Sequence, residues 1–107
     1  LYNVDGASNR IAGICYGPKK VIVVAGINKL VKDIDYAVLR VKHISAPKNC
    51  VRLNRNTPCS RTGKCISDDI NKGCDSVDRI CCNYLISAKQ REEDRISVII
   101  VNEELGF

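Results

Sequence analysis

The sequence has few of the residues that bind nucleic-acid bases or carry out acid–base catalysis. It has no methionine or tryptophan, and only one phenylalanine, four tyrosines and one histidine among 107 residues. Bases would find few aromatic side chains to stack on, and no arginine-rich run or basic recognition helix compensates. No pair of carboxylates and no Ser/His/Asp set stands out. The sequence therefore predicts no nucleic-acid partner, and it leaves open whether the protein is an enzyme.

Long apolar runs are also missing. The longest, residues 21–25, is far shorter than the roughly 20 residues that a membrane-spanning helix needs. No combination of charge, apolar core and small-residue cleavage site marks a signal peptide. We therefore expect no membrane association and a cytoplasmic location. A chain of this length has room for a single domain, residues 1–107.

Positive charge is in moderate excess. Lys and Arg total 17 against 12 Asp and Glu, a formal net charge of +5 that is spread along the chain rather than gathered in a tail. This distribution favours an anionic small molecule as ligand over a polyanion.

Strand and helix patterns alternate along the chain. Residues 1–4 predict a strand, followed by a turn in which Gly6 takes a positive φ and Ser8 caps a helix over about 9–16. The β-branched run at 19–26 predicts a strand buried on both faces, as in the centre of a parallel sheet.

The second half of the chain continues this alternation. An amphipathic helix follows Asp33 and is expected to end at Pro47. Residues 49–54 suggest a brief strand, and 84–89 and 95–101 predict two more strands. The predicted class is α/β, with an open, mostly parallel sheet and flanking helices.

Two turns that follow strands are candidate sites for an anion. In the first, the start of a helix offers free backbone N–H groups, and Asn9 and Arg10 add side-chain donors. The alternative is an Asp–Gly turn with a helix cap and no ligand. In the second, Gly26, Asn28 and Lys29 follow a strand at the sheet edge where open α/β folds bind ligands, although Lys29 could simply be a solvated residue.

Cysteine is abundant, with seven residues, five of them within residues 57–83. That segment is polar and rich in turn residues, which predicts an exposed loop rather than core. The odd number and the long strand and helix patterns argue against a secreted disulfide scaffold, although disulfides and free thiols remain alternatives. Cys15 and Cys50 are expected to be buried thiols, and Cys82 a small packing residue, with a substitute metal ligand as the alternative for Cys82.

Five motifs together resemble one family. They are "NVDGASNR" at 3–10, "APKN" at 46–49, "TPCSRTGKC" at 57–65, "DSVDRIC" at 75–81 and "ISVIIVNEELGF" at 96–107. They resemble the cysteine-containing branch of the LUD family, the lactate-utilisation domain proteins. The resemblance covers only the second half of a family domain, so we expect this chain to be the C-terminal portion of a longer protein. It implies a fold similar to the CoA-transferase and ribose-phosphate isomerase superfamily, and a ligand cleft lined by Asp5, Gly6, Asn9 and Arg10.

The resemblance also implies a metal-binding loop at 57–83. The family pattern Cys-x5-Cys-x2-Cys-x6-Cys is matched by Cys59, Cys65, Cys74 and Cys81, except that eight residues separate the middle pair. We interpret "ISDDINKG" as a local insertion of six residues, which adds little closure entropy at a loop tip. This departure makes the role of Cys74 less certain than those of Cys59 and Cys65.

Four thiolates can hold either a tetrahedral zinc ion or a [4Fe–4S] cluster. Because the paired Cys-x2-Cys knuckles of structural zinc sites are absent, an iron–sulfur cluster is the preferred prediction and zinc the alternative. The cations expected to offset the charge of the site are Arg61, Lys64, Lys72 and Arg79.

Three functions follow from these predictions. The first is a LUD-type accessory in lactate-type redox metabolism, with redox partner proteins and an anionic ligand. The second is a small-molecule-binding module stabilised by zinc, and the third is a transferase or isomerase. Pairing of two copies through an exposed sheet remains open.

Overall fold

The strands of the protein form two separate pairs. The computed structural model describes residues 1–107. In chain order its elements are β1 (Tyr2–Asp5), α1 (Asn9–Cys15), β2 (Val21–Gly26), a 3₁₀ turn (Ile27–Lys29), α2 (Ile34–Arg40), a π-helical turn (Val41–Ser45), α3 (Ala46–Arg52), α4 (Pro58–Thr62), β3 (Asn83–Ile86) and β4 (Ile96–Val101). β1 pairs antiparallel with β3, and β2 pairs parallel with β4. The α/β class is confirmed, with the strands divided between two small sheets, one of them parallel.

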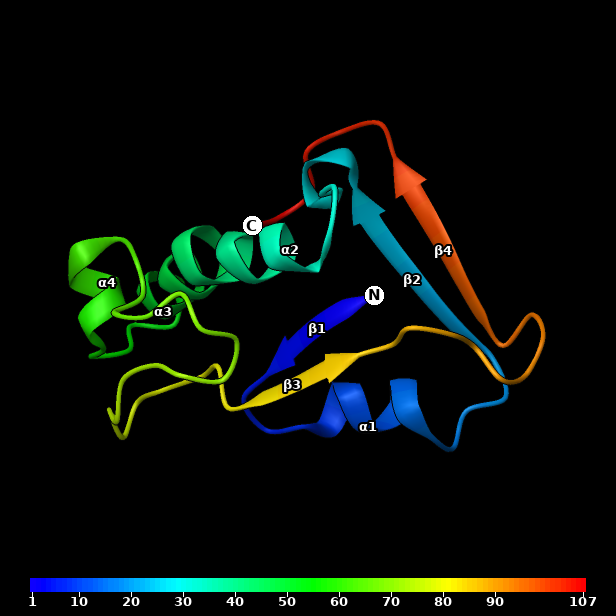
Figure 1. Ribbon diagram of the computed structural model, residues 1–107, viewed down its shortest axis with the longest axis horizontal. Helices are drawn as coiled ribbons and strands as arrows, with labels where there is room; N and C mark the ends of the chain where they lie inside the picture. The colour runs from blue at the N-terminus through cyan, green and yellow to red at the C-terminus, as the bar shows by residue number, and fades with distance from the viewer.

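The two sheets have different surroundings. β1 packs against α1 and α2, so the β1–β3 pair lies between helices near the centre of the molecule (Figure 1). The β2–β4 pair lies at the opposite end of the molecule from α3 and α4 (Figure 1). Arg95, which is buried at the start of β4, donates to the carbonyl oxygens of Gly13 at 3.2 Å and Ile14 at 2.7 Å, and so ties the end of α1 to the parallel pair.

The prediction that the 19–26 strand is buried on both faces is wrong. Ile22 and Val24 on β2 are 61% and 59% exposed, and their neighbours in sequence are only half-buried. On β4, Val98, Ile99 and Ile100 are also exposed. A β-branched run favours a strand, but burial requires another layer, and no α-helix packs extensively against β2 or β4.

One continuous helical segment runs from α2 through the π-helical turn into α3. Asp33 caps its start as predicted, because its carboxylate accepts a hydrogen bond from the backbone N–H of Tyr36 at 2.9 Å. Pro47 does not end the segment, contrary to the prediction, and the strand expected at 49–54 is wrong because those residues lie mainly in α3. The wider π turn precedes Pro47, where an N–H group is missing and the proline ring needs space.

The segment buries a stripe of residues four positions apart. Its members are Val38, Lys42, Ala46 and Cys50, with exposed fractions of 6%, 1%, 9% and 2%. In a regular α-helix of 3.6 residues per turn, such a stripe would drift around the axis. A π turn contains more residues per turn than an α turn. It therefore offsets this drift and keeps the four side chains facing the same neighbours.

Candidate functional site

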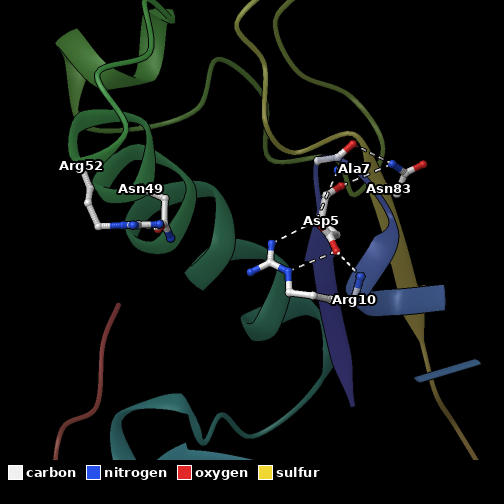
Figure 2. A network of polar contacts seen from close by, with 7 residues as sticks. Asp5, Ala7, Arg10, Asn49, Arg52 and Asn83 are labelled. Carbon is white, nitrogen blue, oxygen red and sulfur yellow. Dashed lines mark hydrogen bonds and ion pairs between the residues drawn. The ribbon is translucent and has the colours of Figure 1, made fainter. Parts of the chain in front are cut away.

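The turn after β1 is organised by the buried carboxylate of Asp5. It accepts hydrogen bonds from the backbone N–H groups of Ala7 at 3.3 Å and Arg10 at 3.1 Å, and from the Arg10 side chain at 3.3 and 3.0 Å (Figure 2). The hydrogen bond from the Arg10 side chain, helped by the backbone bonds and the charge of Arg10, lowers the pKa of Asp5 to about 2. Asp5 is therefore an ionised acceptor that fixes the start of α1 and the position of Arg10.

Two details of this turn differ from the sequence prediction. Ser8 adopts a left-handed conformation, with φ at 66°, and its side chain makes no cap hydrogen bond, so Asp5 takes the capping role. Gly6 is not among the residues with positive φ. A Cβ at Gly6 would instead lie 3.1 Å from the carbonyl oxygen of Ile80, so glycine is needed for close approach to the segment before β3.

A cleft of about 720 Å³ lies between this turn and the α2–α3 segment. The four residues that the family resemblance placed in a ligand cleft all line it: Asp5, Gly6, Asn9 and Arg10. Its remaining cationic residues are Lys29, Arg40 and Arg52. Four cationic side chains against one carboxylate leave an excess of three positive charges in the cleft.

Two of the cleft cations, Arg40 and Arg52, are held in place by neutral oxygens. Arg40 donates from Nε to the carbonyl of Asn28 and from a terminal nitrogen to Ser45 Oγ, both at 2.8 Å. Arg52 donates to Asn49 Oδ1 at 3.1 and 2.9 Å (Figure 2). Burial, followed by the nearby charge of Arg40, lowers the pKa of Lys29. These cations repel one another, so an anion bound in the cleft would reduce the electrostatic repulsion between them.

The second predicted turn binds the C-terminal segment, residues 102–107. Asn28 accepts from the backbone N–H of Leu105 at 3.2 Å and donates to the carbonyl of Gly106 at 3.1 Å. Lys29 Nζ donates to the carbonyl oxygen of Phe107. A Cβ at Gly26 would lie 2.4 Å from the backbone nitrogen of Leu105. Of the three predicted residues only Lys29 also lines the cleft.

The four cysteines of the predicted metal site line one small cavity of about 10 Å³, which we call the thiol cavity. Cys59 comes from α4, Cys65 and Cys74 from the following loop, and Cys81 from the residues just before β3. Cys81 also lines the cationic cleft. The thiol cavity and the cleft therefore share a wall.

Hydrogen bonds from backbone and side-chain groups hold the cysteines at the thiol cavity. Thr57 caps α4 and so fixes Cys59, with its hydroxyl 3.2 Å from Cys59 Sγ. The N–H of Cys65 donates to the carbonyl of Lys42 at 2.9 Å. Arg79 donates to the carbonyls of Cys74 at 3.1 Å and Cys81 at 3.0 Å. Residues 63–82 form a loop in which many residues are exposed, as the composition predicted, whereas the four cysteines at the thiol cavity are buried or half-buried.

Lys42 is the cation that the sequence analysis missed. Its side chain is 1% exposed, and Nζ lies 3.9 Å from Cys65 Sγ and donates to the carbonyl oxygen of Lys72. It also lies 5.9 Å from the centre of the Tyr84 ring. The signal in the sequence was a lysine within a stripe of buried residues at four-residue spacing.

Three of the four predicted cations bind oxygen atoms. Lys72 pairs with Asp69 at 2.6 Å, and Arg61 donates to Asn56 Oδ1. Arg79 binds backbone carbonyls and the hydroxyl of Tyr84. Arg79 also interacts with the Cys81 side chain, so Lys42 and Arg79 are both cations placed close to a cysteine of the thiol cavity.

The other three cysteines differ in their surroundings. Cys50 is buried, as predicted, and burial raises the pKa of its thiol to about 11. Its sulfur lies 3.7 Å from Cys59 Sγ. Cys15 is exposed rather than buried, and Cys82 is exposed rather than packed, with its thiol donating to the carbonyl of Arg79 at 3.3 Å. The seven cysteines are all free thiols.

The donor set fits a thiolate-bound metal centre in its chemistry. Four thiols line one cavity, and a buried ammonium group stands beside one of them to offset negative charge. As the side chains stand, no three Cys, His, Asp or Glu residues are close enough together to hold a metal ion. Metal binding would therefore require the cysteine side chains to rearrange.

Comparisons with known proteins give one match. The family model described as LUD domain matches residues 1–101 of this chain. No curated protein and no solved structure matches the chain. No helix combines the length and the apolar character that crossing a bilayer requires.

Proposed function

The chain belongs to the LUD domain family, and from that premise we propose an accessory role in lactate-type redox metabolism. Family membership supports a function related to lactate utilisation. The finer proposal is that an anionic small molecule binds in the cationic cleft and an iron–sulfur cluster binds at the thiol cavity. The observation that supports it most is that Cys81 lines both spaces.

The charge of the cleft supports an anionic ligand. Arg40 and Arg52 are positioned by hydrogen bonds before any ligand arrives, so little side-chain entropy remains to be lost on binding. The planar guanidinium groups suit a carboxylate or a phosphate. The fork of Arg10 is already occupied by Asp5, so Arg10 contributes charge and its remaining N–H groups.

Buried Lys42 supports a negatively charged centre at the thiol cavity. Placing an ammonium group out of water is costly unless an opposite charge compensates it. It hydrogen-bonds to the Cys65 sulfur and the Lys72 carbonyl, and the carboxylate nearby, Asp69, is paired with Lys72. A [4Fe–4S] cluster with four cysteine ligands carries net negative charge and transfers one electron at a time.

The segment that carries Cys65 and Cys74 is able to rearrange around a [4Fe–4S] cluster. Residues 63–82 contain no helix or strand, and Cys65 and Cys74 lie within them. Their positions depend on single hydrogen bonds to Lys42 and Arg79. In this proposal electrons pass between the organic acid and a redox partner protein in the cytoplasm.

Reconstitution with ferrous iron and sulfide under anaerobic conditions tests the metal site. The wild type should gain visible absorption that bleaches on reduction, with about four irons and four acid-labile sulfides per chain. The double variant Cys59→Ser/Cys65→Ser should lose both, whereas Cys15→Ser/Cys82→Ser, at exposed cysteines outside the cavity, should retain them. Equal iron in the two double variants would refute the assignment. A colourless protein with one zinc per chain would instead favour the structural zinc alternative.

Calorimetric titration with pyruvate and with L-lactate tests the cleft. Arg40→Gln/Arg52→Gln should weaken binding by at least about tenfold, since each lost charge–carboxylate hydrogen bond contributes about 1.5–3 kcal/mol. Lys19→Gln/Arg91→Gln removes the same charge from exposed positions and should leave affinity unchanged. Equal losses in both double variants would mean that net charge, not the cleft, attracts the anion.

A further inference from the structure

Two buried thiols from neighbouring helices lie close together outside the role proposed above. Cys50 on α3 and Cys59 on α4 are 2% and 7% exposed, and their sulfurs are 3.7 Å apart. Cys50 lines neither the thiol cavity nor the cationic cleft. The proposed cluster site therefore leaves unexplained why a second thiol stands beside Cys59.

We propose that Cys50 and Cys59 form a redox-active dithiol, which a low-molecular-weight disulfide such as glutathione disulfide oxidises to a disulfide bond. The dithiol is a modification site in its own right. The effect of the disulfide on metal binding rests on the proposed function, because a Cys59 sulfur bonded to Cys50 can no longer bind the cluster.

The geometry is suitable for a disulfide. The two sulfurs need to approach by less than about 2 Å to reach a bond length near 2.05 Å. Cys50 lies near the end of α3, which stops at Arg52, and Cys59 lies in the first turn of α4, which starts at Pro58. Residues 53–57 join the two short helices without regular structure, so small shifts of either helix are feasible.

Cys59 is also the thiol that an external reagent reaches first. It lines an open groove of about 410 Å³, together with His43, Lys48 and Arg52. Glutathione disulfide carries carboxylates, so the cations of this groove favour its approach. Cys50 does not line the groove.

The reaction balances as a thiol–disulfide exchange. The Cys59 thiolate attacks one sulfur of glutathione disulfide, which breaks the S–S bond and releases one glutathione thiolate. The Cys50 thiol, which burial keeps protonated near neutral pH, loses its proton as its sulfur attacks the Cys59 sulfur, forms the intramolecular disulfide and releases the second glutathione thiolate. The protons of the two protein thiols end on the two glutathiones. The dithiol is oxidised, and one molecule of glutathione disulfide is reduced.

Tryptic mapping tests the dithiol directly. Trypsin separates the two cysteines, because Cys50 falls in the peptide 49–52 and Cys59 in the peptide 56–61. Metal-free protein is treated with glutathione disulfide, trapped with N-ethylmaleimide and digested without reductant. We expect a linked peptide of 49–52 with 56–61, and loss of both alkylated peptides. Absence of the linked peptide, with Cys59 alkylated or left as a glutathione adduct, overturns the proposal.

Two further measurements separate this inference from the proposed function. Cys50→Ala should abolish the linked peptide and still load iron to the wild-type level, whereas Cys59→Ala should abolish both. Protein loaded with cluster should resist formation of the linked peptide. If the Cys50–Cys59 disulfide formed at equal rates in loaded and metal-free protein, the claim that the disulfide and the cluster exclude each other would be overturned. If the wild type never loads iron, the proposed function and that exclusion both fail, while a linked peptide still supports the dithiol.

Discussion

The helical region α2 to α4 contains a row of buried side chains, whereas no side chain of the parallel pair β2–β4 is buried. In the first, Val38, Lys42, Cys50 and Cys59 are all under 10% exposed. In the second, Ile22 and Val24 are more than half exposed. Hydrophobic composition would have ranked the two regions the other way round. Burial here follows from which elements pack together, and only secondarily from the residue types in a run.

The largest expected effect is the difference in unfolding free energy between the same substitution, valine to alanine, made in each region. Val38→Ala should lower the free energy of unfolding by about 2 kcal/mol, because it removes buried methyl groups and leaves a cavity. Val24→Ala, at a position that is 59% exposed, should lower it by less than about 1 kcal/mol. Urea unfolding curves of the two variants measure the difference. Equal losses would break the comparison and would indicate that another surface covers β2 in solution.

Helix caps give a second matched pair. Thr57→Ala should cost about 1 kcal/mol, since Thr57 is 1% exposed and its hydroxyl accepts from the N–H of Ser60 at 3.3 Å. Ser8→Ala removes a side chain at the start of α1 that makes no cap hydrogen bond, and should stay within about 0.5 kcal/mol. A larger loss at Ser8, measured by the urea midpoint, would contradict the capping role of Asp5.

Lys42 gives a test in which stability and loading move in opposite directions. Lys42→Met keeps much of the side-chain volume and removes a buried charge, so the metal-free protein should gain about 1 kcal/mol of stability. The same variant should load less iron, because the cation beside Cys65 is gone. Lys42→Arg keeps the charge and should recover part of the loading. Destabilisation of metal-free Lys42→Met would show that the lysine supports the fold rather than a bound centre.

The smallest effect concerns acid stability at the β1–α1 turn. The pKa of Asp5 is about 2 in the folded protein, below the value of about 3.9 for an unfolded aspartate. Its ionised form therefore favours folding above about pH 4, and this contribution is lost as the pH falls from about 4 towards 2. Asp5→Asn should flatten the stability profile in that interval. Arg10→Gln should move the loss to higher pH, and a profile unchanged in both variants would contradict the ion pair.

The sequence predicted the elements better than it predicted their surroundings. β1, α1, β2 and β4 follow the expected strand and helix patterns, and Asp33 caps its helix as predicted. Propensity and capping are local properties, so they can be inferred from neighbouring residues. Pro47 misled the prediction because a π turn accommodates it inside a helical segment.

The candidate site was predictable in part. The convergence of Cys59, Cys65, Cys74 and Cys81 on one cavity followed from a family resemblance, not from their spacing alone. Lys42, Arg40 and Arg52 face the two spaces only because the α2–α3 segment packs against both. Asn28 was expected to meet a ligand, but it binds the C-terminal segment, a contact between residues nearly eighty positions apart. Such long-range contacts leave no periodic signal in a single sequence.

The central claim is that the cationic cleft and the thiol cavity act as one site across Cys81. Its most direct test is to titrate iron-loaded protein with pyruvate while recording the visible spectrum of the loaded centre. We predict a saturable spectral change in the wild type that matches the calorimetric affinity and is lost in Arg40→Gln/Arg52→Gln. A spectrum that stays constant while calorimetry shows the anion bound would mean that the two spaces are neighbours without a shared function.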